Sequence, residues 1–148
     1  MKIKKVTIED VELVAPLFDL YRQFYEQHPD LASAVNFLTQ RISNNESVIF
    51  LACDEKTDAS LGFVQLYPSF SSVSMKRIWI LNDLFIHSDY RRKGIAEELI
   101  YRIKSFASET NAKGVLLETH LDNTEAKKLY DKTGFVMDEE HSYYYLEV

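Results

Sequence analysis

The stretch IWILNDLFIHSDYRRKGIAEELIYRIKSFA, residues 78–107, decides the fold. Its first nine residues, 78–86, are rich in β-branched and aromatic side chains, and only Asn82 and Asp83 interrupt them. Further along, apolar residues recur at steps of three and four, which is the spacing of one helix face. These residues are Ile95, Leu99, Ile103 and Phe106. The stretch therefore predicts a long strand, a short turn and a helix.

A basic turn, Arg91-Arg92-Lys93-Gly94, separates the predicted strand from the helix. A helix N-terminus carries about half a positive charge and ordinarily prefers acidic side chains, so three cations there indicate that an anion binds. Gly94 allows close approach of the backbone, and the free N–H groups of the first turn, from Ile95 and Ala96 onward, point toward such an anion. The turn alone is equally compatible with a solvated basic loop, and its place between strand and helix favours a phosphate site.

A second motif lies downstream at residues 123–135, NTEAKKLYDKTGF. With the basic turn, it resembles the GNAT superfamily of N-acetyltransferases. That family shows Arg or Gln, two residues, Gly, one residue, then Gly or Ala, and this chain has Arg91, Gly94 and Ala96. The family also shows Asn, Ala, Leu-Tyr, Lys and Gly-Phe at the spacings of residues 123–135. The resemblance covers nearly the whole chain and is weakest before residue 60.

The resemblance implies a single GNAT domain over residues 1–148, of the α/β (α+β) class. The expected architecture is a mixed, mostly antiparallel, twisted sheet of about seven strands flanked by about four helices. The sequence places the strands at residues 2–8, 47–53, 61–67, 75–86 and 112–119, with a final hairpin of 135–137 and 142–148. It places the helices at residues 11–25, 31–43, 95–107 and from 123 onward, with a serine-rich loop over Pro68–Ser74.

Composition sets the class of protein. The 148 residues carry a net charge of −6, which argues against nucleic acid as the main partner and agrees with a cationic substrate. No apolar run is long enough to span a membrane. The lone Cys53 fits core packing better than a nucleophilic role, and it indicates a reducing compartment, so we expect a cytoplasmic protein. The four histidines lack metal-ligand spacing, so no metal is expected.

The resemblance implies acetyl-CoA as co-substrate. Residues 91–96 and Asn123 would hold it, and the backbone of Leu84, Phe85 and Ile86 would pair with its pantetheine arm as a ligand-extended strand edge. Tyr130 matches the general-acid tyrosine of the family, which protonates the leaving thiolate.

The sequence leaves the identity of the general base undecided. The family often has an acid nine residues before the Arg of the first motif, and here that residue is Asn82, which accepts no proton. Asp83 follows, but successive strand residues point to opposite faces unless a bulge intervenes. Asn82 and Asp83 therefore both stand as catalytic candidates, and a structural carboxylate is the alternative for Asp83.

The acceptor site is expected near the first two helices and the end of the strand at 112–119. Tyr21, Tyr25 and Glu26 are substrate candidates there, with core packing or solvation as the favoured alternative for each one singly. Glu118 and His120 are candidates at the strand end, where plain solvation is the alternative.

The resulting prediction is direct transfer of an acetyl group from acetyl-CoA to a primary amine. The similarity is strongest to the polyamine and diamine acetyltransferases and to the histone and polyamine subgroup, which favours a small cationic amine. Acetylation of a protein or peptide amine, acetylation of an amino acid, and a catalytically silent acyl-CoA sensor remain alternatives. The resemblance also implies a homodimer, for which Tyr143, Tyr144 and Tyr145 are candidate interface residues.

Overall fold

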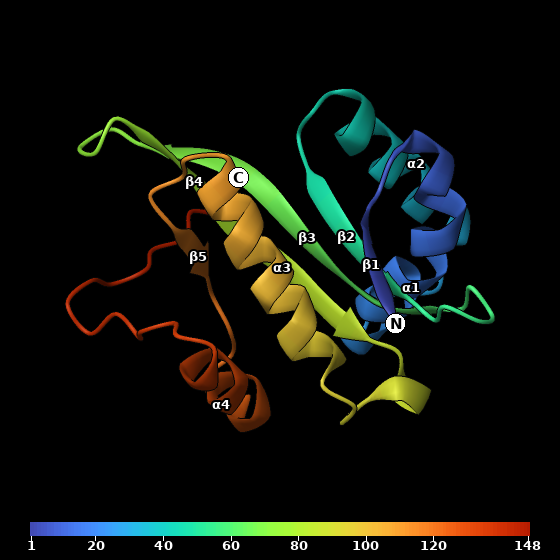
Figure 1. Cartoon of the computed structure of the whole chain (residues 1–148). Coiled ribbons are helices and arrows are strands. Elements are labelled where there is room, and N and C mark those ends of the chain that lie inside the picture. The colour runs from blue at the N-terminus through green and yellow to red at the C-terminus, as the bar shows by residue number, and fades with distance from the viewer. The chain divides into compact units, whose positions relative to one another are not determined.

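The computed structural model describes residues 1–148 and divides them into two compact units, 1–118 and 119–148. The first unit contains a five-stranded sheet in the order β1-β2-β3-β4-β5 (Figure 1). Its strands are β1 (Lys2–Lys5), β2 (Val48–Cys53), β3 (Ser60–Ser71), β4 (Lys76–Ile86) and β5 (Val115–Leu117). Its helices are α1 (Val11–Phe24), α2 (Leu31–Ser43) and α3 (Ile95–Glu109), with short 3₁₀ turns at Ile8–Asp10 and Ser88–Tyr90.

Neighbouring strands of the sheet follow one another in sequence. The first four strands pair antiparallel, whereas β5 pairs parallel to β4 at Trp79–Leu81. Helix α3 connects β4 to β5, so the predicted strand–turn–helix–strand crossover is confirmed. The sheet has five strands in place of the seven that were expected.

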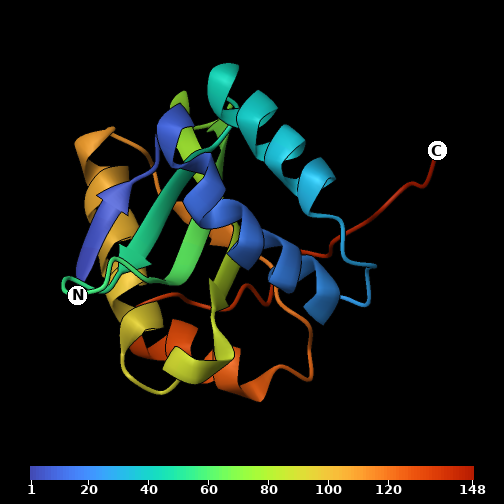
Figure 2. The ribbon, with the colours of Figure 1, turned by 90° about the vertical axis from the view of Figure 1, so that its right-hand side faces the viewer.

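Helices cover both faces of the sheet. In the two views, α1 and α2 lie on one face and α3 lies on the other (Figure 2). The buried strand β2 serves both layers: Ile49 and Leu51 join the core cluster beneath α1 and α2, while the ring of Phe50 lies 5.4 Å from Phe106 of α3. This two-sided burial explains why β2 reads as one continuous apolar run.

The predicted helix starts are confirmed by their capping contacts. The N–H of Thr7 donates to Asp10 Oδ2 at 3.0 Å, a capping contact at the 3₁₀ turn that leads into α1. At α2, Asp30 Oδ1 accepts from the N–H of Ser33 at 3.0 Å. These contacts satisfy backbone N–H groups at the starts of the two helices.

The serine-rich segment around Pro68 is a correction. It was expected to be a loop, but β3 continues to Ser71, and Pro68 is paired opposite Trp79. The reason lies in the neighbouring strand: β2 pairs with β3 only as far as Leu66, so Pro68 has β4 on one side and no strand on the other. Proline is tolerated at such an edge because its missing N–H leaves no ladder partner unsatisfied.

The second unit contains α4 (Thr124–Lys132), the helix that was predicted from residue 123 onward. Asn123 Oδ1 accepts from the N–H of Ala126 at 3.2 Å, and Gly134 follows the helix with a φ of 95°. The final hairpin that was predicted for 135–148 is wrong: these residues form no strand. Only the turn between them appears, where Asp138 Oδ1 accepts from the N–H groups of Glu140 and His141. A two-stranded hairpin without further packing is marginal in water, and most of the side chains here are exposed.

Gly62 allows the close approach of β3 to β4. A Cβ at this position would lie 2.5 Å from Ile86 Cδ1 and 2.7 Å from the carbonyl oxygen of Phe85. We therefore expect Gly62→Ala to lower the free energy of unfolding by about 1–3 kcal/mol, measured by urea denaturation. The matched control is Gly114→Ala, whose Cβ would meet no heavy atom within 4 Å. Equal midpoints for Gly62→Ala and the unmodified chain would contradict this packing.

Candidate functional site

A β-bulge in β4 shapes the site. Gln65 of β3 lies opposite Asp83, but the next residue, Leu66, lies opposite Leu81, so Asn82 is an extra residue in β4. Because of this bulge, the side chains of Asn82 and Asp83 need not alternate between the two faces of the sheet. Asp83 is turned into the protein with only 2% of its surface exposed, while Asn82 is exposed.

Asp83 is the centre of a buried polar cluster. Gln65 Nε2 donates to Asp83 Oδ2 and also to the Tyr67 hydroxyl at 3.2 Å. Asn82 Nδ2 donates to Asp83 Oδ1 at 2.9 Å, and the Tyr21 hydroxyl donates to the main-chain carbonyl of Asn82 at 3.3 Å. The side chain and the peptide group of the bulged residue are therefore both held by neighbours.

Burial controls the protonation of this cluster. It raises the pKa of Asp83 above the ordinary value of 3.8, and the hydrogen bonds from Gln65 and Asn82 offset only part of that rise. Burial, reinforced by the nearby Asp83 carboxylate, also raises the pKa of Tyr21 and of Tyr67 above 10.0. Both tyrosines thus stay protonated: the Tyr21 hydroxyl donates to the carbonyl of Asn82, and the Tyr67 hydroxyl accepts from Gln65. Asp83 holds a proton more readily than an exposed carboxylate does. Gln65 Oε1 is buried without a partner.

Beyond the bulge, β4 has an open edge. Strand β5 pairs only with Trp79–Leu81, while residues 84–86 pair with β3 alone. No strand of the sheet occupies the other side of Leu84, Phe85 and Ile86, which are the residues predicted to bind a ligand through their backbone. Unpaired N–H and C=O groups at such an edge are available to an extended ligand.

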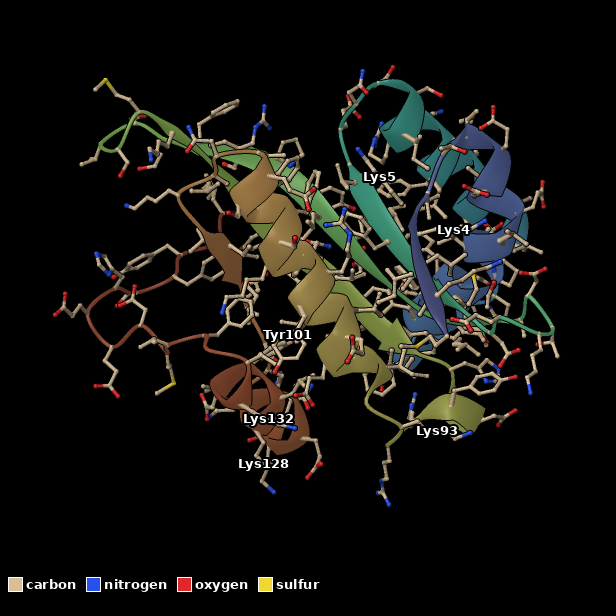
Figure 3. The ribbon with its side chains drawn as sticks, viewed as in Figure 1. Lys4, Lys5, Lys93, Tyr101, Lys128 and Lys132 are labelled. Atoms are coloured by element: carbon tan, nitrogen blue, oxygen red, sulfur yellow. The ribbon has the colours of Figure 1, made fainter.

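The basic turn has the geometry of an anion cradle. Gly94 adopts a φ of 78°, and no heavy atom lies within 4 Å of where a Cβ would stand. Arg91 Nε donates to the carbonyl of Ile86 at 3.1 Å, which ties the turn to the end of β4. Lys93 Nζ donates to the carbonyl of Asp89 at 3.2 Å, and its position before α3 is seen in Figure 3. Arg91, Arg92 and Lys93 are all exposed, and Ile95 and Ala96 begin α3 directly after them.

The other predicted site residues of the first unit lie at its surface. The exposed Tyr25 packs edge-on against Tyr21, with ring centroids 5.0 Å apart. Glu26 is exposed and adopts a φ of 62° just after α1. Glu118 is exposed beyond the end of β5. The structure therefore brings Tyr21, Asn82 and Asp83 together, with Tyr25 beside them.

The remaining predicted residues, His120, Asn123 and Tyr130, belong to the second unit. Tyr130 lies on α4 with its ring centroid 5.6 Å from that of Phe135. Asn123 caps α4 through its side chain. His120 is exposed, and its Nδ1 accepts from the N–H of Asp122 at 3.3 Å.

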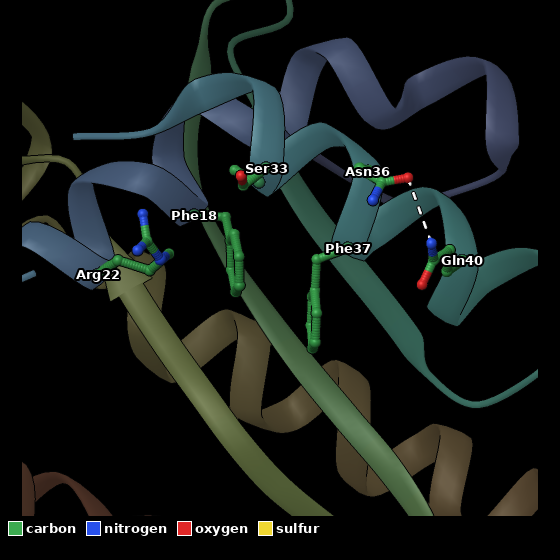
Figure 4. A pocket seen from close by; sticks show the side chains of 7 residues that line it. Phe18, Arg22, Ser33, Asn36, Phe37 and Gln40 are labelled. Atoms are coloured by element: carbon green, nitrogen blue, oxygen red, sulfur yellow. Dashed lines mark hydrogen bonds between the residues drawn. The ribbon is translucent and has the colours of Figure 1, made fainter. Parts of the chain in front are cut away.

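An open hollow of about 410 Å³ lies between α1 and α2 (Figure 4). The rings of Phe18 and Phe37 stack within it at 5.7 Å, with their planes only 5° apart. Arg22 of α1 contributes a guanidinium group, and Gln40 Nε2 donates to Asn36 Oδ1 at 3.3 Å on the α2 side. The lining residues are Phe18, Arg22, Ser33, Ala34, Asn36, Phe37 and Gln40.

The sequence prediction missed Gln65 and the residues of the hollow. Gln65 is the one polar residue in the apolar run 61–67, and that break in the pattern was a usable signal. Arg22 follows Phe18 by four residues and so shares its helix face, but only the fold brings α2 against them.

Three further features concern the cysteine, metal-binding groups and the helices. Cys53 is buried, and burial raises the pKa of its thiol, which agrees with the predicted core role. No three His, Cys, Asp or Glu side chains are gathered so that they could hold a metal ion. None of the helices has both the length and the apolar character needed to cross a membrane.

Asp83 gives stability a particular pH dependence. Because its pKa is raised on folding, the folded state holds the proton over a window above pH 3.8, and the stability contributed by that proton is lost as pH rises through the folded pKa. Asp83→Asn is neutral at all pH values, so we expect it to gain stability relative to the unmodified chain as pH rises through this window. Urea denaturation from about pH 4 to pH 8 checks this. A variant that instead loses relative stability with rising pH would show that the ionised carboxylate is favoured.

Comparison with known proteins identifies the family of the chain. Residues 14–135 match the model of the acetyltransferase (GNAT) family. The chain is 44% identical over 148 residues to the uncharacterized N-acetyltransferase YhfO of Bacillus subtilis (strain 168), covering 100% of this chain and 98% of that protein. A crystal structure of a probable acetyltransferase, 43% identical, superimposes with a TM-score of 0.95 over 100% of this chain and 98% of that one. The D-amino-acid N-acetyltransferase HPA3 of Saccharomyces cerevisiae (strain ATCC 204508 / S288c) is 30% identical over 88 residues, covering 60% of this chain and 55% of that protein. The chain belongs to the GNAT family and is an acetyltransferase.

Proposed function

We propose that the protein transfers the acetyl group of acetyl-CoA directly to a primary amine of a small molecule. The observation that carries this proposal is the open edge of β4 at residues 84–86, which ends at an anion cradle on the N-terminus of α3. An extended ligand with a phosphate group at one end is complementary to both features. The family match spans parts of both compact units, which supports the proposal that residues 1–148 act as one domain.

Acetyl-CoA fits the residues that would hold it. The cradle is open at Gly94 and is flanked by three exposed cations, which suits a pyrophosphate. The backbone of Leu84, Phe85 and Ile86 would pair with the amide groups of the pantetheine arm, and Asn123 is a further proposed contact. When bound, the co-substrate supplies the activated thioester.

The amine needs a site that favours its neutral form. An alkylammonium with a pKa of about 10.4 is neutral in roughly one molecule in a few thousand at pH 7. Asn82 is exposed at the bulge, and its Nδ2 is engaged by Asp83, which leaves Oδ1 free to accept from the amine. We assign Asp83, directly behind it, as the proton acceptor, since a raised carboxyl pKa favours proton uptake.

The leaving thiolate needs a proton. Tyr130 is the proposed donor, because a tyrosine hydroxyl with a pKa of about 10 can protonate a thiolate that is placed beside it. The buried Cys53 offers no accessible nucleophile for an acetylated intermediate, which supports direct transfer.

Two acceptor classes have specific support. The net charge of −6 supports a small cationic amine such as a polyamine or diamine, as predicted from the sequence. The name of the yeast relative supports an amino acid. A peptide or protein amine is a third class, and Tyr21, Tyr25, Glu26, Glu118 and His120 remain the proposed acceptor contacts.

The surroundings of the enzyme are also proposals. We propose a cytoplasmic homodimer without nucleic-acid or membrane partners, supported by the acidic composition and by the exposed Tyr143, Tyr144 and Tyr145. Light scattering that shows a monomer at high concentration would exclude the dimer.

A non-catalytic acyl-CoA sensor is the alternative to an enzyme, since Asn82 stands where the family often has an acid.

The first test is release of CoA from acetyl-CoA across polyamines, amino acids, aminoglycosides and peptides, with Tyr130→Phe in parallel. Loss of the general acid should lower kcat at least about 100-fold, with the Kd for acetyl-CoA unchanged. Phenylalanine keeps the ring contact with Phe135, so the variant removes only the hydroxyl. Binding of acetyl-CoA without turnover of any amine would favour the sensor.

The anion cradle is tested by Gly94→Ala. A side chain at a φ of 78° is strained, and its Cβ would project into the space proposed for the pyrophosphate. We expect acetyl-CoA to bind about tenfold more weakly by calorimetry, with a stability loss of no more than about 1 kcal/mol. Unchanged affinity would place the pyrophosphate elsewhere.

A further inference from the structure

We infer that the hollow between α1 and α2 binds the carboxylate of the acceptor, with an apolar or aromatic side chain against Phe18 and Phe37. The acceptor class is then the α-amino acids and related amino carboxylates, in preference to polyamines. This inference rests on the proposed acetyl transfer and names the substrate class for it.

The walls of the hollow select an apolar group. The rings of Phe18 and Phe37, one from each helix, stack on one another (Figure 4); Phe18 is 8% exposed and Phe37 is half-buried, so Phe37 offers most of the exposed aromatic surface. Ala34 of α2, itself buried, belongs to the same lining. A side chain laid on these rings gains the free energy of apolar burial and of ring stacking, whereas the charged chain of a polyamine gains neither in full.

Arg22 is held so that part of its guanidinium can serve a ligand. Its Nη1 donates to Asp19 Oδ1 at 2.8 Å and to the carbonyl of His28 at 3.3 Å. No partner within the chain engages Nε or Nη2. Because Nη1 holds the guanidinium in place, Nε and Nη2 are oriented to donate to a ligand. A carboxylate is a planar acceptor that can take both of these hydrogen bonds.

The polar groups of the hollow are mostly donors. The Asn36 side chain receives a bond from Gln40 at Oδ1 and keeps its own Nδ2 for a ligand, and the hydroxyl of Ser33 lies in the same lining. The lining contains no acidic side chain. The carboxylate beneath it, Asp19, is buried and already accepts from Arg22, from Gln23 Nε2 at 3.2 Å and from the N–H of Asp30. The lining therefore offers no acidic side chain to an ammonium group, whereas a carboxylate finds the remaining donors of Arg22 and Asn36.

The hollow connects with the bulge of β4 through aromatic contacts. The rings of Phe18 and Tyr21 lie 6.4 Å apart, and the Tyr21 hydroxyl donates to the carbonyl of Asn82. Phe18 thus lines the hollow, and Tyr21, one turn further along α1, contacts Asn82 at the proposed reaction centre. Arg22 directly follows Tyr21 in α1, so the inference places the amine of the acceptor on the Tyr21 side of the hollow, toward Asn82.

A pair of acceptors that differ by one carboxylate tests this. We would measure kcat/KM for phenylalanine and for 2-phenylethylamine with the unmodified enzyme, Arg22→Gln and Arg22→Lys. The unmodified enzyme should prefer phenylalanine. Arg22→Gln should lower its kcat/KM at least about tenfold, chiefly through KM, and leave the amine nearly unchanged. Arg22→Lys keeps a cation beside Asp19 and is the second variant in case Arg22→Gln does not fold. It should lower kcat/KM for phenylalanine by a smaller factor.

The matched control is Arg102→Gln. Arg102 has a similarly exposed side chain, 31% against 28% for Arg22, and pairs with Glu109 at 3.0 Å on α3, away from the hollow. Its removal should leave both acceptors unaffected. Equal turnover of both acceptors by the unmodified enzyme, or equal losses for both in Arg22→Gln, would overturn the inference while leaving acetyl transfer intact.

Failure of acetyl transfer itself is recognised separately. If no amine is acetylated, the binding of phenylalanine is measured by calorimetry with acetyl-CoA present. Saturable binding that weakens about tenfold in Arg22→Gln would support the carboxylate site without the reaction. No binding of phenylalanine would overturn the inference.

Discussion

The site depends on one extra residue in β4. Asn82 has no partner of its own on β3, so the strand changes its alternation between Leu81 and Asp83. Asp83 consequently turns inward toward Gln65 and Tyr21, and the bulged residue stays exposed with its carbonyl and its side chain both held. Pairing with β5 stops at Leu81, just before the bulge. The open strand edge and the buried carboxylate therefore begin at the same point of β4.

This arrangement is unfavourable for stability, which points to a functional reason for it. A carboxylate with 2% exposure loses most of its hydration, and the donors around it compensate only in part, so its pKa rises. Gln65 Oε1 adds a buried acceptor without a partner. Apolar residues would fill this space with a more stable core. Perturbed titratable groups inside a sheet are typical of sites where protons move, and the bulge places this one beside an exposed polar residue.

Much of the fold followed from local pattern. The bounds of α2 were predicted in full because Asp30 caps a clear apolar period, and the β4–α3–β5 crossover followed from residues 78–117. The bulge could not be predicted from the sequence, because either of the two polar residues Asn82 and Asp83 could point to either face of the sheet. Pro68 was misjudged because its tolerance depends on where β2 ends. The C-terminal hairpin was wrong because apolar alternation needs a neighbouring strand to become a sheet. The hollow joins residues from two helices, and only their packing reveals it.

The most direct measurement of the central claim is amide hydrogen exchange followed by NMR, with and without acetyl-CoA. If β4 and the start of α3 form the binding edge, the amides of residues 82–86 that do not bond to β3, and those of residues 94–96, should become protected on binding. The amides of β1 and β2, which lie on the other side of β3, should not change. Protection confined to other segments, or no protection at saturating acetyl-CoA, would contradict the account.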